Sequence, residues 1–272
     1  MSNRTDQSEA LLGKESIHAQ WESAYFNPDT DVFYELLFDQ IVEALGATPG
    51  QSVLDAGCGY CFHAMRLARR GLRVTGVDFS EAALRHGRAN IEAAGLSDSI
   101  TIQRADLLAL PFEDASFDFV QCFGVLMHIP EVESALEELA RVLKPGGRLV
   151  LKENNVRSLH VRYWEPTLRL VKKVLGRKLP QRNQTERGIE EWQESDSGGL
   201  MVRKTNMDWL ARFYEERGLR LVHRFAGTFT ELFTSIPTRP LKRAVHTFNR
   251  SWVLHRRDFG VAQGNILVFQ KN

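Results

Sequence analysis

Three aspartates and two glycines are the residues of this 272-residue sequence that best suit ligand binding by their chemistry and their positions. Asp55 lies two residues before Gly57, Gly59 lies two residues after Gly57, and Asp78 comes 19 residues after Gly59, followed by Asp106. Carboxylates accept hydrogen bonds from hydroxyl and amino groups, and glycines let a ligand approach the backbone closely. The set suits a ligand with a diol, an exocyclic amine and a positive centre.

These residues follow short apolar segments that alternate with helical patterns, the first of which ends at Gly71. Strands separated by helices predict parallel β-α units with right-handed crossovers. Ligands of such sheets bind beyond the carboxyl ends of the strands, where all three aspartates fall. We expect strands at 52–56, 73–78, 100–103, 117–123 and 148–152, and further helices at 81–94 and 131–143.

The second half is less regular. A helix is expected at 206–217, with strands at 218–223 and 265–269. Two irregular stretches, about 155–203 and 227–264, lie between these elements.

The Gly57-Cys58-Gly59 turn invites comparison with the dinucleotide-binding fingerprint, although it can also be only a tight turn. Phe62 occupies the third glycine position of that fingerprint, where close helix–strand packing needs glycine. Phe62 and Asp106 therefore argue against a nicotinamide oxidoreductase. A nucleoside that carries a sulfonium and an ammonium fits the aspartates better.

The chain resembles the class I S-adenosylmethionine-dependent methyltransferases, with a core like that of methyltransferase types 11 and 25. The resemblance implies a Rossmann-like α/β fold, in which helices cover both faces of a seven-stranded, mostly parallel sheet. It also implies an enzyme of the EC 2.1.1 class. The matching segments run in the expected order over about residues 50–153: 53–59, 74–80, 105–106 with 110–112, 117–120 and 143–148.

The same resemblance predicts the organisation of the chain. Residues 1–50 form an N-terminal helical cap, and 51–154 form the half of the core that binds the cofactor. Two insertions follow strands five and six: 155–204 is a substrate cap, and about 227–263 is a basic insertion within the C-terminal part of the core, 205–272.

The resemblance also implies which residues contact the methionine part of S-adenosylmethionine. Asp55 would hold the ammonium group, directly or through water. The backbone of the glycine turn would lie against the methionine chain, which the residues after strand four would border. The predicted set is Asp55, Gly57, Cys58, Gly59, Gln121 and Phe123.

The adenosine part would be held at the next two strand ends. Asp78 would accept hydrogen bonds from the ribose diol, and Phe79 would pack on the adenine. Asp106 would accept from the adenine amine, and the Leu107 N–H would donate to a ring nitrogen. The alternative for both aspartates is a helix N-cap or turn role.

Aromatic residues near the N-terminus have two interpretations. Tyr25, with Trp21 and Phe26, would close over the cofactor and attract the sulfonium through cation–π contacts, or would pack as a hydrophobic staple on the core. His128, after strand four, is the candidate catalytic residue: a general base, or a packed or positioning histidine.

Several classes are excluded. Three cysteines (58, 61 and 122) cannot pair fully, and Cys58-x-x-Cys61 lacks the partner ligands of a metal site, so we expect neither disulfides nor metal. No apolar run reaches the roughly 18 residues of a membrane span, and the polar N-terminus does not resemble a signal peptide. These features predict a cytoplasmic protein.

The net charge of +1 is the sum of segments with opposite charges. Residues 155–182 carry +7 and residues 236–257 carry +6, which leaves −12 for the remainder. Trp164, Leu168, Val171 and Leu175 share one face of a possible basic helix. That helix is either a solvated cap over the core or a contact for anionic or lipid-linked groups at a membrane surface. Nucleic acid is disfavoured, because no base-stacking module is present.

The acceptor is less well defined than the cofactor. The sequence lacks [DNS]-P-P-[YFW] and Pro-Cys after strand four, so amide, base-amine and cytosine C5 methylation of those types are disfavoured. We predict methyl transfer to an O or N nucleophile of a small molecule, glycan or lipid-linked acceptor. Lys152-Glu153-Asn154 resembles protein N-terminal methyltransferases, which is one alternative. A non-catalytic S-adenosylmethionine-binding regulatory protein is the other.

Overall fold

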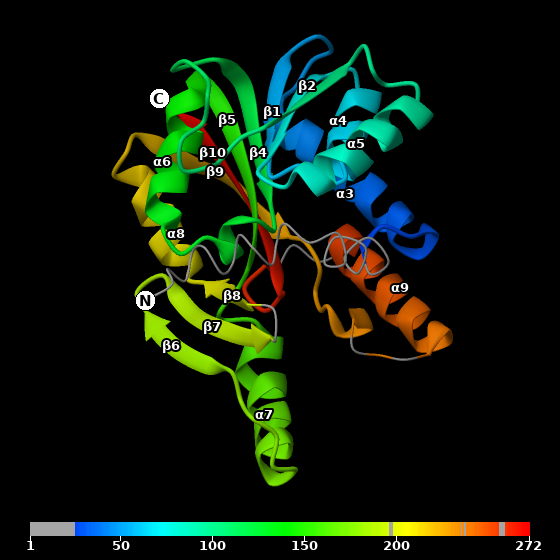
Figure 1. Ribbon diagram of the computed structural model, residues 1–272, viewed down its shortest axis with the longest axis vertical. Helices are drawn as coiled ribbons and strands as arrows, with labels where there is room; N and C mark the ends of the chain where they lie inside the picture. The colour runs from blue at the N-terminus through cyan, green and yellow to red at the C-terminus, as the bar shows by residue number, and fades with distance from the viewer. Residues whose placement is uncertain (1–24, 196–197, 235, 237, 256–258) are drawn as a thin grey trace.

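A seven-stranded sheet forms the centre of the computed structural model, which describes residues 25–195, 198–234, 236, 238–255 and 259–272 (Figure 1). The strand order is β3-β2-β1-β4-β5-β10-β9, and β10 alone runs antiparallel to its neighbours β5 and β9. The predicted α/β fold with a mostly parallel sheet is confirmed. The strands are β1 (Ser52–Ala56), β2 (Arg73–Asp78), β3 (Ile100–Arg104), β4 (Phe117–Phe123), β5 (Leu143–Asn154), β9 (Leu219–Ala226) and β10 (Gly264–Lys271).

Helices cover both faces of this sheet (Figure 1). One apolar cluster packs α3 (Pro28–Leu45), α4 (Phe62–Arg69) and α5 (Glu81–Ala93) on one face. A second cluster packs α6 (Val132–Val142) and α8 (Met207–Glu215) on the other. Both faces of the central strands are thus buried, as their apolar sequences predict.

The helices begin where their sequences supply caps. Ser80 accepts a hydrogen bond from the Ala83 N–H at the start of α5. Asn27 and Thr30 form a reciprocal capping box at the start of α3. These caps place the first turns of α3 and α5 beside the carboxyl ends of the strands.

The segment after β5 is more ordered than the sequence predicts. Instead of an irregular stretch, it forms a π-helical turn, helix α7 and a separate antiparallel sheet of order β6-β7-β8. The elements are η2 (His160–Trp164), α7 (Glu165–Val174), β6 (Gln181–Thr185), β7 (Gly188–Ser195) and β8 (Gly198–Thr205).

The expectation that α7 covers the core is wrong. None of its residues is buried, and it extends away from the central sheet (Figure 1). The stretch before β10 also contains a helix that the sequence did not predict, α9 (Arg239–His255), preceded by η3 (Leu232–Thr234). In the part of the chain that is described, no helix combines the length and apolarity that crossing a bilayer requires.

Candidate functional site

The glycine turn lies at the carboxyl end of β1, against the end of β2. The N–H groups of Gly57 and Cys58 both donate to the Val77 carbonyl, at 2.8 and 2.9 Å. Gly57 has φ +81°, and a Cβ there would collide with the side chain of Val125. Gly59 has φ +51°, and no atom of the described residues lies within 4 Å of the place its Cβ would take. The turn is therefore fixed at Gly57 and open at Gly59.

A buried carboxylate lies directly below this turn. Asp55 is 2% exposed, and its Oδ1 accepts a hydrogen bond of 3.0 Å from Nε2 of Gln121 on β4. The Oδ2 atom of Asp55 and the Oε1 atom of Gln121 are buried and have no hydrogen-bond partner among the described residues. Burial, with the charge of Asp78 nearby, raises the pKa of Asp55 to about 6. Two unpartnered buried acceptors fit a cationic donor such as an ammonium group.

Asp78, at the end of β2, is tied to both neighbouring segments. Its Oδ2 accepts from the Gly59 N–H and its Oδ1 from the Ser80 N–H, both at 2.9 Å. Asp78 is 7% exposed. The turn role and the ligand role are compatible, because each carboxylate oxygen can accept a second hydrogen bond.

The predicted adenine contacts lie after β2 and β3. Phe79 is half-buried and Leu107 is buried. Asp106 is exposed, and its Oδ1 accepts a hydrogen bond of 2.9 Å from the Leu108 N–H. Asp106 therefore shapes its own turn, which is the alternative that the sequence left open, while its exposed position leaves the second oxygen accessible.

The two described N-terminal aromatic residues have different contacts. Phe26 stacks on Phe62 at a centroid distance of 4.4 Å, which is the packing role. The Tyr25 hydroxyl donates to Oε2 of Glu231 at 3.2 Å, and its role toward the cofactor stays a prediction. Phe123, the predicted methionine neighbour, packs edge-on against Phe38 at 5.7 Å. Trp21 lies outside the described residues.

His128 lies on η1 (Leu126–His128), the turn after β4. Its Nδ1 lies 2.7 Å from the carbonyl of Met201 on β8, so Nδ1 carries the proton. Burial lowers the pKa of His128, so the imidazole is neutral at pH 7 with an unprotonated Nε2. This geometry is compatible with both the base and the positioning role.

A buried polar cluster that the sequence did not single out lies at the end of β5. Nζ of Lys152 is 3.7 Å from Oε1 of Glu231, whose other oxygen accepts from Tyr25. Although burial opposes it, the nearby Tyr34 and Glu231 raise the pKa of Lys152, which keeps the ammonium charged. Lys152 belongs to the Lys-Glu-Asn segment, but residues far apart in the chain complete the cluster, so no local pattern could reveal it.

The next residue, Glu153, points to the opposite face of the sheet. It is 1% exposed, and its Oε2 accepts a hydrogen bond of 2.8 Å from the Thr205 hydroxyl. Its Oε1 is buried without a partner among the described residues. Burial raises the pKa of Glu153 to about 7, so the carboxyl is partly protonated at neutral pH.

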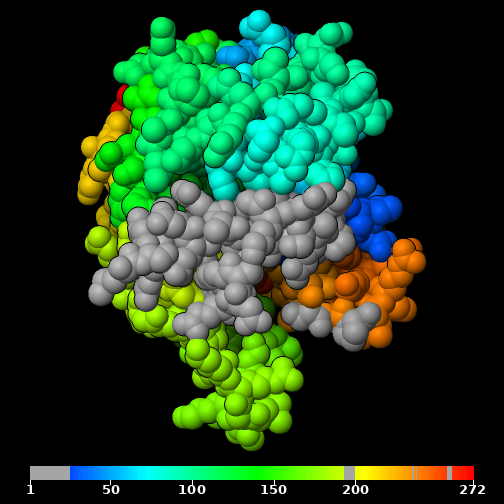
Figure 2. Space-filling view, viewed as in Figure 1, coloured from blue at the N-terminus to red at the C-terminus, as the bar shows by residue number. Residues whose placement is uncertain are grey.

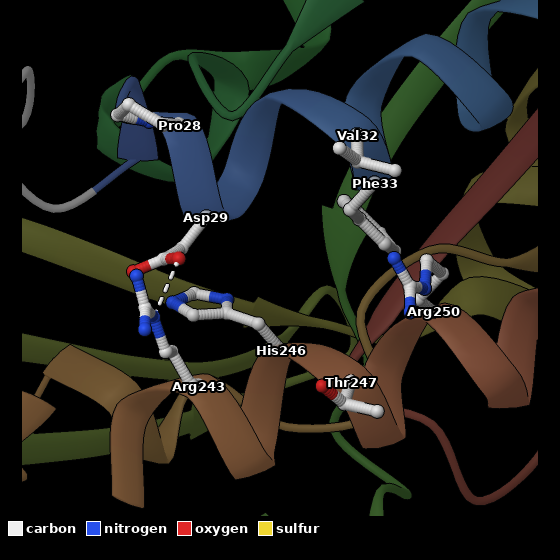
Figure 3. A pocket seen from close by; sticks show the side chains of 8 residues that line it. All are labelled: Pro28, Asp29, Val32, Phe33, Arg243, His246, Thr247 and Arg250. Atoms are coloured by element: carbon white, nitrogen blue, oxygen red, sulfur yellow. Dashed lines mark hydrogen bonds and ion pairs between the residues drawn. The ribbon is translucent and has the colours of Figure 1, made fainter. Parts of the chain in front are cut away.

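A cavity of about 180 Å³ lies between α3 and α9, as Figure 3 shows. Arg243 spans it to Asp29 at 3.0 Å, and His246 and Arg250 lie on the same side. None of the predicted cofactor residues lines this cavity. The described residues also contain no cluster of His, Cys, Asp or Glu that could hold a metal ion.

The two cysteines of the glycine turn region are free and buried. Hydrogen bonding with Cys61, together with burial, raises the pKa of Cys58 well above its ordinary value. Cys58 is therefore a thiol at neutral pH, without the thiolate character that metal binding or redox chemistry needs.

Known proteins share sequence and fold with this chain. Residues 54–151 match the methyltransferase domain family. The chain is 37% identical over 125 residues to methyltransferase GfsG of Streptomyces halstedii, covering 46% of this chain and 45% of that protein. It is 34% identical over 149 residues to the 27-O-demethylrifamycin SV methyltransferase of Amycolatopsis mediterranei, covering 54% and 53%.

The fold has solved counterparts. The magnesium protoporphyrin IX methyltransferase of Synechocystis, solved with bound S-adenosylhomocysteine, superimposes with a TM-score of 0.61 at 20% identity, covering 97% of this chain and 98% of that one. Residues 54–151, which match the methyltransferase domain family, contain the glycine turn and strands β2 and β4. Residues 54–151 are thus similar to a methyltransferase domain, and the chain has the fold of this solved methyltransferase. It spans about half the length of the curated relatives it matches.

Proposed function

We propose that the protein transfers the methyl group of S-adenosylmethionine to an O or N nucleophile of a small-molecule acceptor. The observation that carries this proposal is the buried Asp55–Gln121 pair, with two unpartnered acceptor atoms beside the open turn at Gly59. Two buried acceptor atoms without hydrogen-bond partners destabilise a protein core, whereas an ammonium group donates hydrogen bonds to both.

The other predicted residues fit the remaining parts of the same cofactor. Asp78 offers the ribose diol two acceptor oxygens held in place by backbone N–H groups. Phe79 and Leu107 offer apolar surface to the adenine, and Asp106 offers it a carboxylate oxygen. When bound, S-adenosylmethionine supplies an electrophilic methyl group on its sulfonium.

The residues after β4 and β5 face the acceptor in this proposal. Nε2 of His128 either takes the acceptor's proton or positions the acceptor. Methyl transfer depends mainly on alignment and on excluding water, so a base is needed for a hydroxyl and is optional for a neutral amine.

The acceptor class is proposed from the relatives and from the charge of the insertions. The name of the 27-O-demethylrifamycin SV methyltransferase gives oxygen as its acceptor atom. This relative favours oxygen over nitrogen as the acceptor atom here. The basic segments 155–182 and 236–257 favour an anionic, glycan or lipid-linked molecule over a neutral one. A protein acceptor and a purely regulatory role are the alternatives that the experiment must exclude.

Two measurements test the proposal. Calorimetry should show S-adenosylmethionine binding that weakens in Asp78→Ala and in Asp106→Ala; unchanged affinity in both variants would refute the cofactor site. Labelled S-adenosylmethionine should transfer its methyl group to the small-molecule fraction of a lysate from the source organism. Label in the protein fraction would support the alternative acceptor, and binding without any S-adenosylhomocysteine formation would support the regulatory role.

A further inference from the structure

Helix α7 presents its apolar residues to solvent. It projects from the rest of the molecule, as Figure 2 shows at the lower end of the view. Val174 is 78% exposed, and Leu170 is 63% exposed. Tyr163 and Trp164, at the end of η2 directly before α7, are 60% and 46% exposed. Such a concentration of apolar surface on a projecting helix indicates an interaction site.

An ordinary surface helix packs its apolar side on the protein, whereas α7 turns its apolar side toward solvent. Its charged side faces the protein: Glu165 pairs with Lys204 at 2.8 Å, and Arg169 pairs with Glu191 at 3.1 Å. At 100° per residue, the apolar residues gather on the side that these ion pairs leave outward. Those residues are Tyr163, Trp164, Leu168, Leu170, Val171, Val174 and Leu175.

The charges around this outward face are positive. The only acid between residues 162 and 178 is Glu165, which is already paired with Lys204. No carboxylate in the described part of the chain pairs with Lys172 or Lys173. The cations of the segment beside this face are Arg162, Lys172, Lys173 and Arg177.

We propose that α7 docks this protein on an anionic lipid surface. Its apolar residues enter the headgroup region, and the flanking cations contact lipid phosphates. Tyr163 and Trp164 suit this depth, because their rings are amphipathic. A second copy of the chain is a poorer occupant, since two such faces would bring like charges together. Docking is independent of methyl transfer and goes beyond the proposed function.

Vesicle sedimentation of the full chain, without cofactor, tests this proposal. We expect binding to phosphatidylcholine vesicles with about 30% phosphatidylglycerol, and little binding to pure phosphatidylcholine or in about 0.5 M salt. Lys172→Gln with Lys173→Gln should weaken binding roughly 25-fold, at about fivefold per cation. Leu170→Ser, at an exposed position, should weaken it roughly tenfold without affecting folding.

Matched controls separate α7 from the remaining surface. Arg69→Gln with Arg85→Gln removes two exposed cations elsewhere, and Val32→Ser removes an exposed apolar side chain; both should leave binding within about twofold. The proposal is overturned if the anionic vesicles do not bind the protein, or if the controls weaken binding as much as the α7 variants do. Vesicle-independent dimers that Leu170→Ser dissociates would overturn it in favour of an interface between copies.

Discussion

Replacing Asp55 by asparagine should stabilise the free protein and weaken cofactor binding at the same time. The substitution keeps the shape of the side chain, and the asparagine Oδ1 can still accept the hydrogen bond from Gln121. It removes a buried charge whose Oδ2 has no partner among the described residues. A residue kept for stability would respond to this substitution in the opposite direction.

The magnitude follows from the pKa of Asp55, which burial raises to about 6. Because the folded state favours the protonated carboxyl, its ionisation destabilises the fold as pH rises from about 4 to about 6. A shift of about 2 units corresponds to roughly 3 kcal/mol, fully present at pH 8 and absent at pH 4. Urea unfolding at pH 8 should therefore show Asp55→Asn to be more stable by up to roughly 3 kcal/mol.

Cofactor affinity should change in the other direction. An ammonium group loses a charge-assisted hydrogen bond when Asp55 becomes neutral, which amounts to about 1.5–3 kcal/mol, or roughly 10- to 150-fold in Kd. In the unaltered protein, the affinity measured by calorimetry should also weaken below about pH 6, as Asp55 takes up its proton. In the asparagine variant, this pH dependence should disappear.

Asp118→Asn is the matched control. Although burial opposes it, hydrogen bonds from Lys144 and Ser52 lower the pKa of Asp118 to about 2. Its ionised form therefore stabilises the fold above about pH 4, and the asparagine variant should be less stable at pH 8 with unchanged cofactor affinity. If Asp55→Asn instead destabilises the protein, or binds S-adenosylmethionine as tightly as the parent, the assignment of Asp55 is refuted.

Three further predictions concern the same region. Gly57→Ala should destabilise the fold by about 2 kcal/mol or more, because its Cβ would collide with Val125. Gly59→Ala should destabilise the fold by about 1–2 kcal/mol and mainly weaken cofactor binding. Urea unfolding and calorimetry distinguish the two variants. Glu153→Gln should raise stability by up to roughly 3 kcal/mol at pH 8 but not at about pH 4, because burial raises the pKa of Glu153 to about 7; equal effects at both pH values would contradict this. His128→Ala should lower stability by about 1–3 kcal/mol, and a base role requires a further fall of roughly 100-fold or more in turnover with cofactor affinity retained.

The fold of the first half could be predicted because its signals are local. Each strand is a short apolar run, and each aspartate follows a strand within a few residues, so order along the chain already places Asp55 and Asp78 at one edge of the sheet. The parallel pairing of β1 with β2 then brings the turn after β1 to the end of β2, where the Gly59 N–H meets Asp78.

The β6–β8 sheet could not be predicted, because charged side chains are buried in it beside the apolar ones. Glu190 and Glu191 on β7 are 7% and 8% exposed, and they pair with Arg203 and Lys204 on β8. Buried ion pairs leave a strand with the composition of a loop. Helix α9 was not predicted for a similar reason. The few residues that it buries include the polar His246, so its sequence lacks a clear apolar face.

The turn that carries His128 depends on this unpredicted sheet. Arg203 of β8 is 1% exposed and donates hydrogen bonds of 3.0 Å to the carbonyls of Leu126 and Ile129, which flank His128. The Met201 carbonyl on the same strand holds the His128 ring. Lys204, the next residue after Arg203, anchors Glu165 of α7. One strand thus connects the projecting basic helix to the turn that carries the candidate catalytic histidine, so a displacement of β8 would move both.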